Sequence, residues 1–256
     1  MSNKIFAAVI RVATGLLAGL LLLFLVAIIG ELFASRALRP LPAAEIWFAI
    51  RLSLLTATIS SLTAVVFALP IAYGLTRNRF RFQKIIDTLL DLPLVLSPVA
   101  LGAMILVFLN TGFGRFLETL AGGIVFNFKG IVVAQFFVVV GLAIRQLKLA
   151  FEAVDPEYEE LARTLGCNRL QAFSRVTLPL AARGLIAAFM LVWARAVGEF
   201  GATITLAGAT TMKTETIPTA IYLSFASADI HGAAIFILIL VGVSLSLLYG
   251  TRKLTV

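Results

Sequence analysis

Long apolar stretches, with charged side chains only near their ends, dominate the pattern of this chain. Residues 10–31, 50–76, 88–111 and 231–251 each form such a stretch. A helix needs about 20 mostly apolar residues to cross the hydrocarbon core of a bilayer. The runs are continuous and do not alternate as the strands of a membrane β-barrel do. The pattern therefore predicts four transmembrane helices.

Two further stretches carry charges but keep the same apolar character. Residues 129–148 hold a shorter uncharged run, and their long basic side chains can reach the interface from the ends of a helix. Residues 184–207 are long enough to span, although Arg195 and Glu199 lie inside the stretch. We predict an all-α membrane protein with six transmembrane helices in a single domain, residues 1–256. The first span is expected to stay as an anchor, because no clear cleavage site follows it.

Composition supports a membrane protein and excludes several kinds of site. Hydrophobic residues make up 61% of the chain and charged residues only 13%, with a mean hydropathy of +1.04. Soluble domains are near half apolar and a quarter charged. The chain has one cysteine and one histidine, so an internal disulfide is excluded and a metal site built from several such ligands is not expected.

The net charge of +8 is distributed unevenly between the two sides of the predicted membrane. Basic residues gather on the cytoplasmic side of multi-pass proteins. With the N-terminus in the cytoplasm, that side holds most of the 21 basic residues, namely Lys4, Arg11, Arg77, Arg79, Arg81, Lys84, Arg145, Lys148, Arg163, Arg169, Arg175, Arg183, Arg252 and Lys253. The opposite side holds Arg36, Arg39, Arg51, Arg115, Lys129 and Lys213. The charge thus predicts a cytoplasmic N-terminus and needs no nucleic-acid partner.

The segment 149–183, between the fourth and fifth spans, is the one long cytoplasmic insertion that the pattern predicts. Asp155 and Pro156 suit the start of a helix, because Asp can cap and Pro fits the first turn. One apolar stripe follows at helical spacing, formed by Tyr158, Leu161, Ala162 and Leu165. The segment is expected to begin with a short amphipathic helix.

The second half of this insertion predicts a turn and another helix. Gly166 stands where a left-handed C-terminal cap is expected. Asn168 can cap the next helix, with Gln171 three residues later as in a capping box. Such a helix–glycine–helix fits three roles: an amphipathic hairpin on the membrane, a DNA-binding helix-turn-helix, or a docking element. DNA binding is disfavoured because membrane helices hold both ends of the segment.

Three groups of residues in the insertion resemble the cytoplasmic signature loop of permease subunits of ABC importers. They are Glu160-Leu161-Ala162, then Gly166, then Val176-Thr177-Leu178-Pro179, and the gaps fit throughout. Leu161 departs from the alanine of the family pattern. The resemblance implies that the loop docks on a separate ATPase subunit. The implied docking residues are Glu160, Leu161, Ala162, Leu165, Gly166, Cys167, Asn168 and Arg169.

ATP hydrolysis is not expected from this chain itself. A phosphate-binding loop needs the pattern G-x-x-x-x-G-K-[ST], and the sequence does not contain it. We therefore expect a non-catalytic subunit that binds no cofactor, with ATP used by a partner.

The fifth predicted span carries the second informative block. Charges inside a span are costly and usually face a bundle interior or a water-filled path. Arg195 and Glu199 are four residues apart, so a salt bridge that fixes packing and a gate in a pathway are equally compatible with the spacing. The whole block gives the pathway or gate candidates Arg195, Gly198, Glu199, Phe200, Gly201 and Thr203.

Within this block, the run from Gly198 to Thr203 resembles the fifth-helix segment of molybdate permeases. Related sulfate and tungstate permeases are similar, so they stay as alternatives. The resemblance implies an oxyanion substrate, a homodimer in the inner membrane with two ATPase copies, and a periplasmic oxyanion-binding protein. The alternative class is an ATP-independent secondary transporter or channel, which the absence of inverted hydropathy repeats disfavours.

Overall fold

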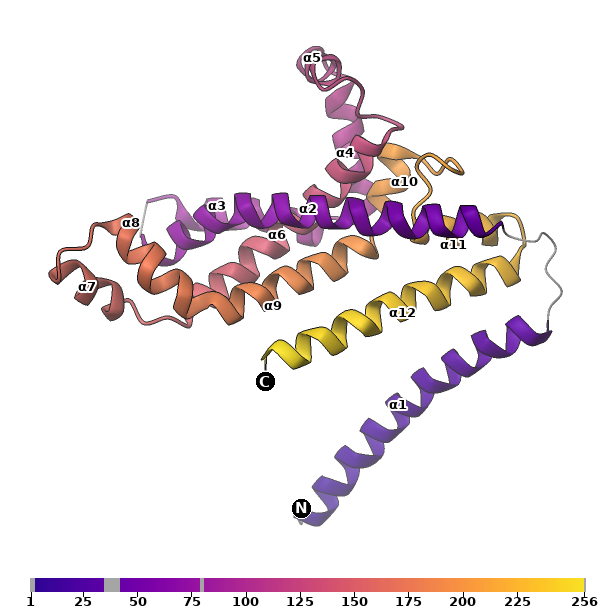
Figure 1. Ribbon diagram of the computed structural model, residues 1–256, viewed down its shortest axis with the longest axis horizontal. Coiled ribbons are helices and arrows are strands. Elements are labelled where there is room, and N and C mark those ends of the chain that lie inside the picture. Colours follow the sequence, from indigo (N-terminus) through magenta and orange to yellow (C-terminus); the bar gives the residue numbers. More distant parts are fainter. Residues whose placement is uncertain (1–2, 35–41, 79–80, 256) are drawn as a thin grey trace.

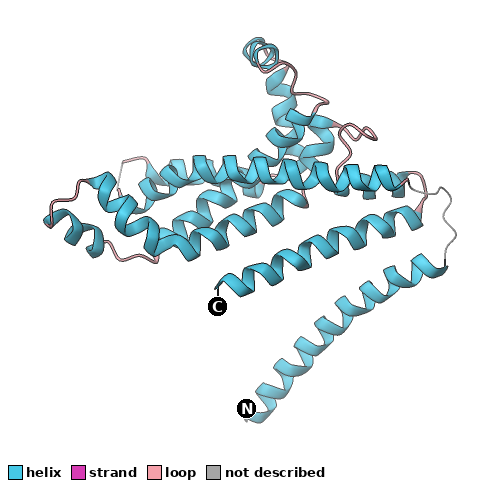
Figure 2. Cartoon of the chain, in the orientation of Figure 1, coloured by secondary structure: helices cyan, strands magenta, loops and turns pink. Residues whose placement is uncertain are grey.

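The computed structural model describes residues 3–34, 42–78 and 81–255. Every regular element in these ranges is helical (Figure 2). The helices are α1 (Asn3–Ala34), α2 (Ala43–Arg77), α3 (Gln83–Val95), α4 (Pro98–Leu109), α5 (Gly112–Leu120), α6 (Phe128–Glu152), α7 (Glu157–Thr164), α8 (Arg169–Ala172), the π-helix η1 (Phe173–Thr177), α9 (Leu178–Val197), α10 (Gly201–Ala207), α11 (Ile217–Ala226) and α12 (Ile230–Thr255). Arg36, Arg39 and Arg79, used in the orientation argument, lie outside the described residues.

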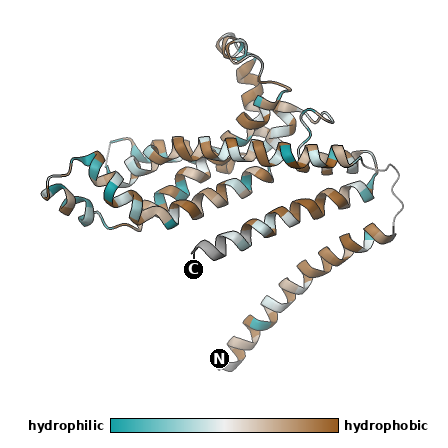
Figure 3. Ribbon diagram, in the orientation of Figure 1, coloured by the Kyte–Doolittle hydropathy of each residue, from teal (hydrophilic) through white to brown (hydrophobic). Residues whose placement is uncertain are grey.

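The long helices form one bundle, and the short helices lie at its ends. Within the described residues, five helices are long and apolar enough to cross a membrane, or six if the bent pair α3–α4 counts as one span. Figure 1 shows α2, α6 and α9 running side by side, with α7 and α8 together at one end. Hydrophobic residues cover most of the long helices, and hydrophilic ones gather near α7 and α8 (Figure 3). The predicted all-α membrane fold is confirmed.

The predicted third span, 88–111, is not one helix. It is divided into α3 and α4, which meet at an angle of 110°. Ser97 has extended backbone (ψ 142°), and its Oγ accepts a hydrogen bond from the N–H of Ala100. Pro98 restricts the residue before it to extended conformations and suits the first turn of a new helix. The Ser97-Pro98 pair therefore starts a new helix, and the expectation of one continuous helix over 88–111 was wrong.

The predicted fifth span, 184–207, is also divided. The candidate span extends from Arg169 to Val197, so it starts earlier than predicted and ends earlier too. Gly198 caps α9, and a separate short helix, α10, occupies the rest of the predicted range. A charged side chain placed at such a break can hydrogen-bond to free backbone groups, which it could not do inside a continuous helix.

The core between α2 and α6 is built from small residues. Ala57, Ala64 and Ala68 of α2 and Ala134 of α6 are fully buried. Small side chains let membrane helices approach closely, since apolar burial alone does not drive helices together in lipid. The close contact of these two helices gives the bundle a rigid centre.

Polar side chains connect this centre to α9. Gln135 is fully buried; its Oε1 accepts from Ser60 Oγ at 3.1 Å, and its Nε2 donates to the carbonyl of Ala196 at 3.1 Å. Trp193 Nε1 donates to Thr58 Oγ1 at 2.9 Å. Ser60 and Thr58 of the second span thus serve interhelical packing, the commoner use of such residues in membranes.

Helix α1 packs differently from the other spans. Its most apolar window is not buried at all, and it lies next to α12 at the margin of the bundle (Figure 1). A helix that is apolar on all sides requires lipid or another protein around it. The predicted anchor, 10–31, therefore forms a helix, but it contributes little to the core.

Replacing Gly102 by alanine is expected to destabilise the junction of α4 with α10. A Cβ at Gly102 would lie 2.9 Å from both the Cα and the carbonyl oxygen of Ala202, so backbone would have to shift. Overpacking of this kind costs about 1–3 kcal/mol. We expect a lower midpoint of thermal unfolding in detergent for Gly102→Ala. The control is Gly19→Ala, where a Cβ meets nothing within 4 Å; equal midpoints for the two variants would contradict the prediction.

Candidate functional site

The turn between α7 and α8 has the backbone that its sequence predicts. Gly166 has φ +95°, and the N–H groups of Gly166 and Cys167 donate to Arg163 and Ala162, both at 3.1 Å. Glycine adopts this left-handed region without the steric cost that a Cβ brings. The predicted C-terminal cap at Gly166 is confirmed.

Caps also fix the starts of both short helices. Asp155 Oδ1 accepts from the N–H of Glu157 at 3.0 Å. At α8, Asn168 Oδ1 accepts from the N–H of Gln171 at 2.8 Å, and Gln171 Oε1 accepts from the N–H of Asn168 at 2.9 Å. The predicted capping box is confirmed. These local bonds fix the residues at which α7 and α8 begin.

The apolar residues of this segment point away from the bundle. Leu161 is 61% exposed, Leu165 80% and Leu170 74%, and Tyr158 is exposed as well. We call these four residues the α7–α8 face. Ala162 is the exception in the predicted stripe, because it is buried against the bundle. A cluster of exposed apolar residues is typical of a surface that contacts either another protein or the membrane.

The remaining predicted docking residues are distributed around this face. Glu160, Gly166, Asn168 and Arg169 are exposed, and Cys167 is half-buried. The structure thus brings the predicted residues together at one end of the bundle, with Ala162 on the inner side.

Glu159 lies on the inner side of α7 and was not among the residues predicted from sequence. Its Oε1 accepts from Thr177 Oγ1 at 2.6 Å and from Arg77 Nε at 2.8 Å, and its Oε2 accepts from Tyr73 Oη at 2.7 Å. Arg77 Nη2 also donates to the carbonyl of Val154 at 2.7 Å. Glu159 precedes Ala162 by three residues, so both occupy one face of the helix, but the sequence does not show that this face is the buried one.

The surroundings of Glu159 keep its carboxylate ionised. Burial favours the neutral acid, but hydrogen bonds from Thr177, Tyr73 and Arg77, together with the positive charge of Arg77, outweigh burial and lower the pKa of Glu159. The carboxylate is therefore a charged acceptor at neutral pH.

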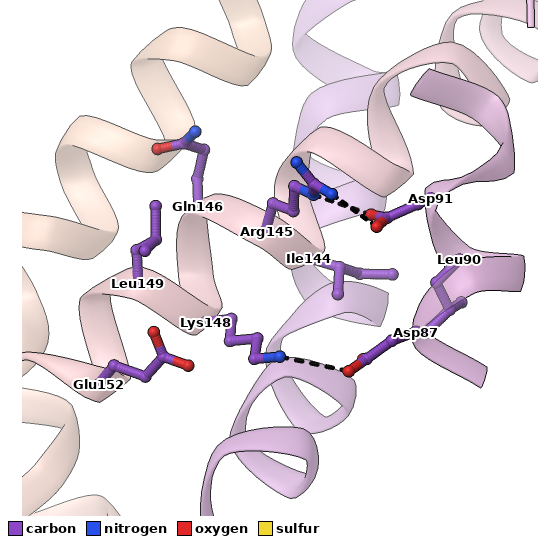
Figure 4. A pocket seen from close by; sticks show the side chains of 9 residues that line it. All are labelled: Asp87, Leu90, Asp91, Ile144, Arg145, Gln146, Lys148, Leu149 and Glu152. Atoms are coloured by element: carbon purple, nitrogen blue, oxygen red, sulfur yellow. Dashed lines mark hydrogen bonds and ion pairs between the residues drawn. The ribbon is translucent and has the colours of Figure 1, made fainter. Parts of the chain in front are cut away.

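A second group of charges joins α3 to α6. Asp91 makes two bonds to Arg145, Oδ2 to Nη2 at 2.6 Å and Oδ1 to Nε at 2.9 Å, while Asp87 Oδ2 lies 3.4 Å from Lys148 Nζ. Figure 4 shows the two pairs side by side along a pocket of about 510 Å³. Their side chains are partly exposed, and such pairs contribute roughly 0–1 kcal/mol each. They fix the register of α3 on α6 more than they stabilise the fold.

The charged pair predicted in the fifth span is present, but it lies at the break between two helices. Arg195 Nη1 is 2.7 Å from Glu199 Oε2, and Glu199 Oε1 accepts from the N–H of Ala202 at 2.9 Å. The Glu199 side chain is 1% exposed, against 40% for Arg195. Glu199 therefore caps the start of α10 and neutralises Arg195. The Arg195 guanidinium remains partly exposed.

Most of the predicted pathway residues line one shallow pocket beside this pair. The pocket measures about 300 Å³ and is lined by Pro98, Val99, Arg195, Gly198, Glu199, Phe200 and Gly201. Thr203 does not line it, because its side chain is fully buried in the core. The ring of Phe200 packs against Tyr222, with centroids 5.2 Å apart. The arrangement offers one partly exposed cation in a largely apolar setting, which suits transient contact with an anion.

The family of the chain follows from its similarity to known proteins. A family model described as the inner membrane component of binding-protein-dependent transport systems matches residues 64–251. This chain belongs to that family. It is an inner-membrane permease subunit of the ABC-importer type, and the resemblance seen in the sequence is confirmed.

Several relatives of the permease carry substrate names. A probable molybdenum ABC transporter permease protein of Haloferax volcanii is 38% identical, covering 91% of this chain and 86% of the relative. The molybdenum transport system permease ModB of Escherichia coli is 38% identical over 69% of this chain and 78% of its own length. The sulfate transport system permease CysT of Salmonella typhimurium is 36% identical, with 80% and 75% covered.

Solved structures share the fold of the permease at low sequence identity. A crystal structure of a bacterial alginate ABC transporter in complex with an alginate-bound periplasmic protein matches with a TM-score of 0.71 at 18% identity, covering 98% of this chain and 95% of that chain. The inward-facing MetNI methionine ABC transporter matches with a TM-score of 0.66 at 15% identity, covering 84% and 98%. Both likenesses support the fold.

Proposed function

We propose that the permease forms the membrane pathway of an ATP-driven importer for an oxyanion, and that this oxyanion is molybdate. The observation that carries the proposal is the 38% identity with a probable molybdenum permease across 91% of the chain. The sulfate permease at 36% identity, and a molybdate/tungstate permease of Pyrococcus abyssi at 35%, keep sulfate and tungstate as alternatives. The pocket beside Arg195 supports an anionic substrate.

In this proposal, the permease performs no covalent chemistry and binds no cofactor. An ABC ATPase subunit hydrolyses ATP and docks on the α7–α8 face. Two permease chains form a homodimer with two ATPase copies, and a periplasmic oxyanion-binding protein delivers the substrate on the opposite side. The exposed leucines of the face support the ATPase contact, since docking would remove them from water.

Docking of the ATPase also fixes the orientation that we propose. The α7–α8 end of the bundle faces the cytoplasm, and the N-terminus lies on the same side. The start of α2 and the start of α12 lie at the opposite end (Figure 1). This orientation agrees with the excess of basic residues predicted for the cytoplasmic side.

The pathway is proposed to pass the break between α9 and α10. Arg195, Gly198, Glu199, Phe200 and Gly201 line its wall there. Thr203 would act only from within the core, as a packing residue behind the wall.

Reconstitution into liposomes tests the proposed function. The permease is combined with its ATPase subunit and the oxyanion-binding protein, and uptake of molybdate is measured with and without ATP. We expect uptake only when ATP and all three components are present, with competition by tungstate and weaker competition by sulfate. Uptake by the permease alone, without ATP, would instead identify a secondary transporter or channel. Uptake of sulfate in preference to molybdate would correct the substrate and keep the ATP-driven mechanism.

A further inference from the structure

We infer that Glu159 is a positioning residue that ties the docking helix α7 to the membrane helices, so that a movement imposed on α7 reaches α2 and α9. The inference rests on the proposed function, because it assigns a role inside the ATPase-coupling end of the bundle. It concerns the inner side of α7, which faces the bundle and not the ATPase subunit.

The bonds of Glu159 join three separate parts of the chain. Tyr73 and Arg77 belong to the last turns of α2, and Thr177 is the last residue of η1, directly before α9. Through Arg77, the network also reaches Val154, just after α6. One carboxylate thus holds α7 against the end of α2 and the start of α9, at distances of 2.6–2.8 Å, and Arg77 extends the network to the end of α6. Hydrogen bonds to an ionised group are shorter and stronger than neutral ones.

Aromatic rings pack around Tyr73, one of the donors to this carboxylate. Tyr73, which donates to Glu159, lies with its ring centroid 4.5 Å from that of Phe173 and 5.7 Å from that of Phe151. The Phe151 side chain is fully buried, and Phe173 begins η1. The three rings come from α2, α6 and η1, so the ends of these elements are packed together around the bond to α7.

A π-helix lies at this junction. Single-turn π-helices inside longer helices are rare and occur often at functional sites. Here η1 lies between α8 and α9, and Thr177 at its end donates to Glu159. A displacement of α7 would therefore pull directly on the start of α9, whose other end carries Arg195.

The outer face of α7 is available to the ATPase subunit, and the inner face contacts the bundle. Leu161 and Leu165 point outward, and Glu159 and Ala162 point inward. Loss of the outward residues would weaken docking, whereas loss of the Glu159 carboxylate would leave docking intact and break transmission. This difference makes the inference testable separately from the docking surface.

The test compares ATP hydrolysed per oxyanion transported in proteoliposomes of the complete importer. Glu159→Gln keeps the side-chain shape but removes the charge. We expect the variant to copurify with the ATPase subunit as the natural chain does, while the ATP consumed per molybdate rises about fivefold or more, the range that coupling free energies between sites produce. Tyr73→Phe, which keeps the ring and removes one donor, should shift the ratio in the same direction by less. The double variant should be no worse than Glu159→Gln, because both changes break one network.

Glu157→Gln is the matched control, with the same loss of charge on an exposed residue of the same helix. Its ratio should equal that of the natural chain. Equal ratios for Glu159→Gln and Glu157→Gln would overturn the inference, and so would loss of copurification in Glu159→Gln. If Glu159→Gln does not fold, Tyr73→Phe carries the test, and a natural ratio there overturns the inference. Absence of ATP-driven uptake by the natural chain would instead count against the proposed function.

Discussion

Gly166→Pro is expected to abolish ATP-driven uptake while leaving the membrane bundle folded. Proline fixes φ near −65°, and Gly166 has φ +95°. The substitution also removes the N–H that donates to the carbonyl of Arg163. A conflict of this kind costs about 3 kcal/mol or more in a helix. Because Gly166 is exposed and a Cβ there meets nothing within 4 Å, the damage stays in the turn between α7 and α8.

The measurement pairs uptake in proteoliposomes with copurification of the ATPase subunit. Gly166→Ala should give an intermediate loss, since a left-handed alanine costs about 1–2 kcal/mol. The control is Gly74→Ala, at a helical glycine of α2 whose Cβ would also meet nothing within 4 Å. Charge reversal by Glu160→Lys tests the exposed surface without changing the backbone. Normal copurification and normal uptake in both Gly166→Pro and Glu160→Lys would show that α7 and α8 do not dock the ATPase.

Local rules account for what the sequence predicted well. Gly166 and the Asn168–Gln171 capping box depend on bonds within a few residues, and the structure has them as expected. Apolar run lengths gave the long helices, because crossing a bilayer imposes a minimum length on each. These features need no knowledge of which helices are neighbours.

Features that depend on distant parts of the chain were missed. Glu159 and Glu160 are adjacent acids in the sequence, and only the approach of Tyr73 and Thr177 makes Glu159 the bonded one. Asp91 lies in α3, and its partner Arg145 lies in α6. Which acid bonds to the bundle depends on which side of the helix is buried. In a helix as short as α7, the sequence indicates the buried side only weakly.

The breaks at Ser97 and Gly198 show a related difficulty. The predicted spans 88–111 and 184–207 each read as one apolar run, because a bend in the backbone does not change the hydropathy of the residues on either side of it. In the structure, α4 and α10 pack directly against each other, and Gly201 lies so close to Pro98 and Val99 that a Cβ would be 3.0 Å from both side chains. The two breaks therefore depend on each other, and they place Arg195 and Glu199 beside a pocket.

Glu199→Gln is expected to slow molybdate uptake about tenfold without unfolding the permease. The amide oxygen can still accept from the N–H of Ala202, so the start of α10 keeps its cap. Arg195 loses its ionised partner, and its partly exposed guanidinium then carries an uncompensated charge in the pocket. An anion would bind that charge more tightly and leave it more slowly; a bond to a charged group contributes about 1.5–3 kcal/mol, which corresponds to a tenfold change or more. Glu199→Ala should be worse, because it also removes the acceptor for the N–H of Ala202 and leaves a cavity at a buried site, so the yield of folded protein should fall.

Uptake rate, basal ATPase activity and the midpoint of thermal unfolding together decide the role of Glu199. Glu118→Gln is the matched control: Glu118 Oε1 also accepts from backbone N–H groups, those of Ile124 at 2.9 Å and Val125 at 3.0 Å, but Glu118 does not line the pocket at Arg195. If Glu199→Gln and Glu118→Gln lower the midpoint alike and leave uptake per folded molecule unchanged, Glu199 serves packing only. If Glu199→Gln alone slows uptake or alters basal ATPase activity, the pair controls passage through the pathway. The charge on Arg195 then explains why a costly buried carboxylate is placed at this break: it prevents the cation from holding the substrate.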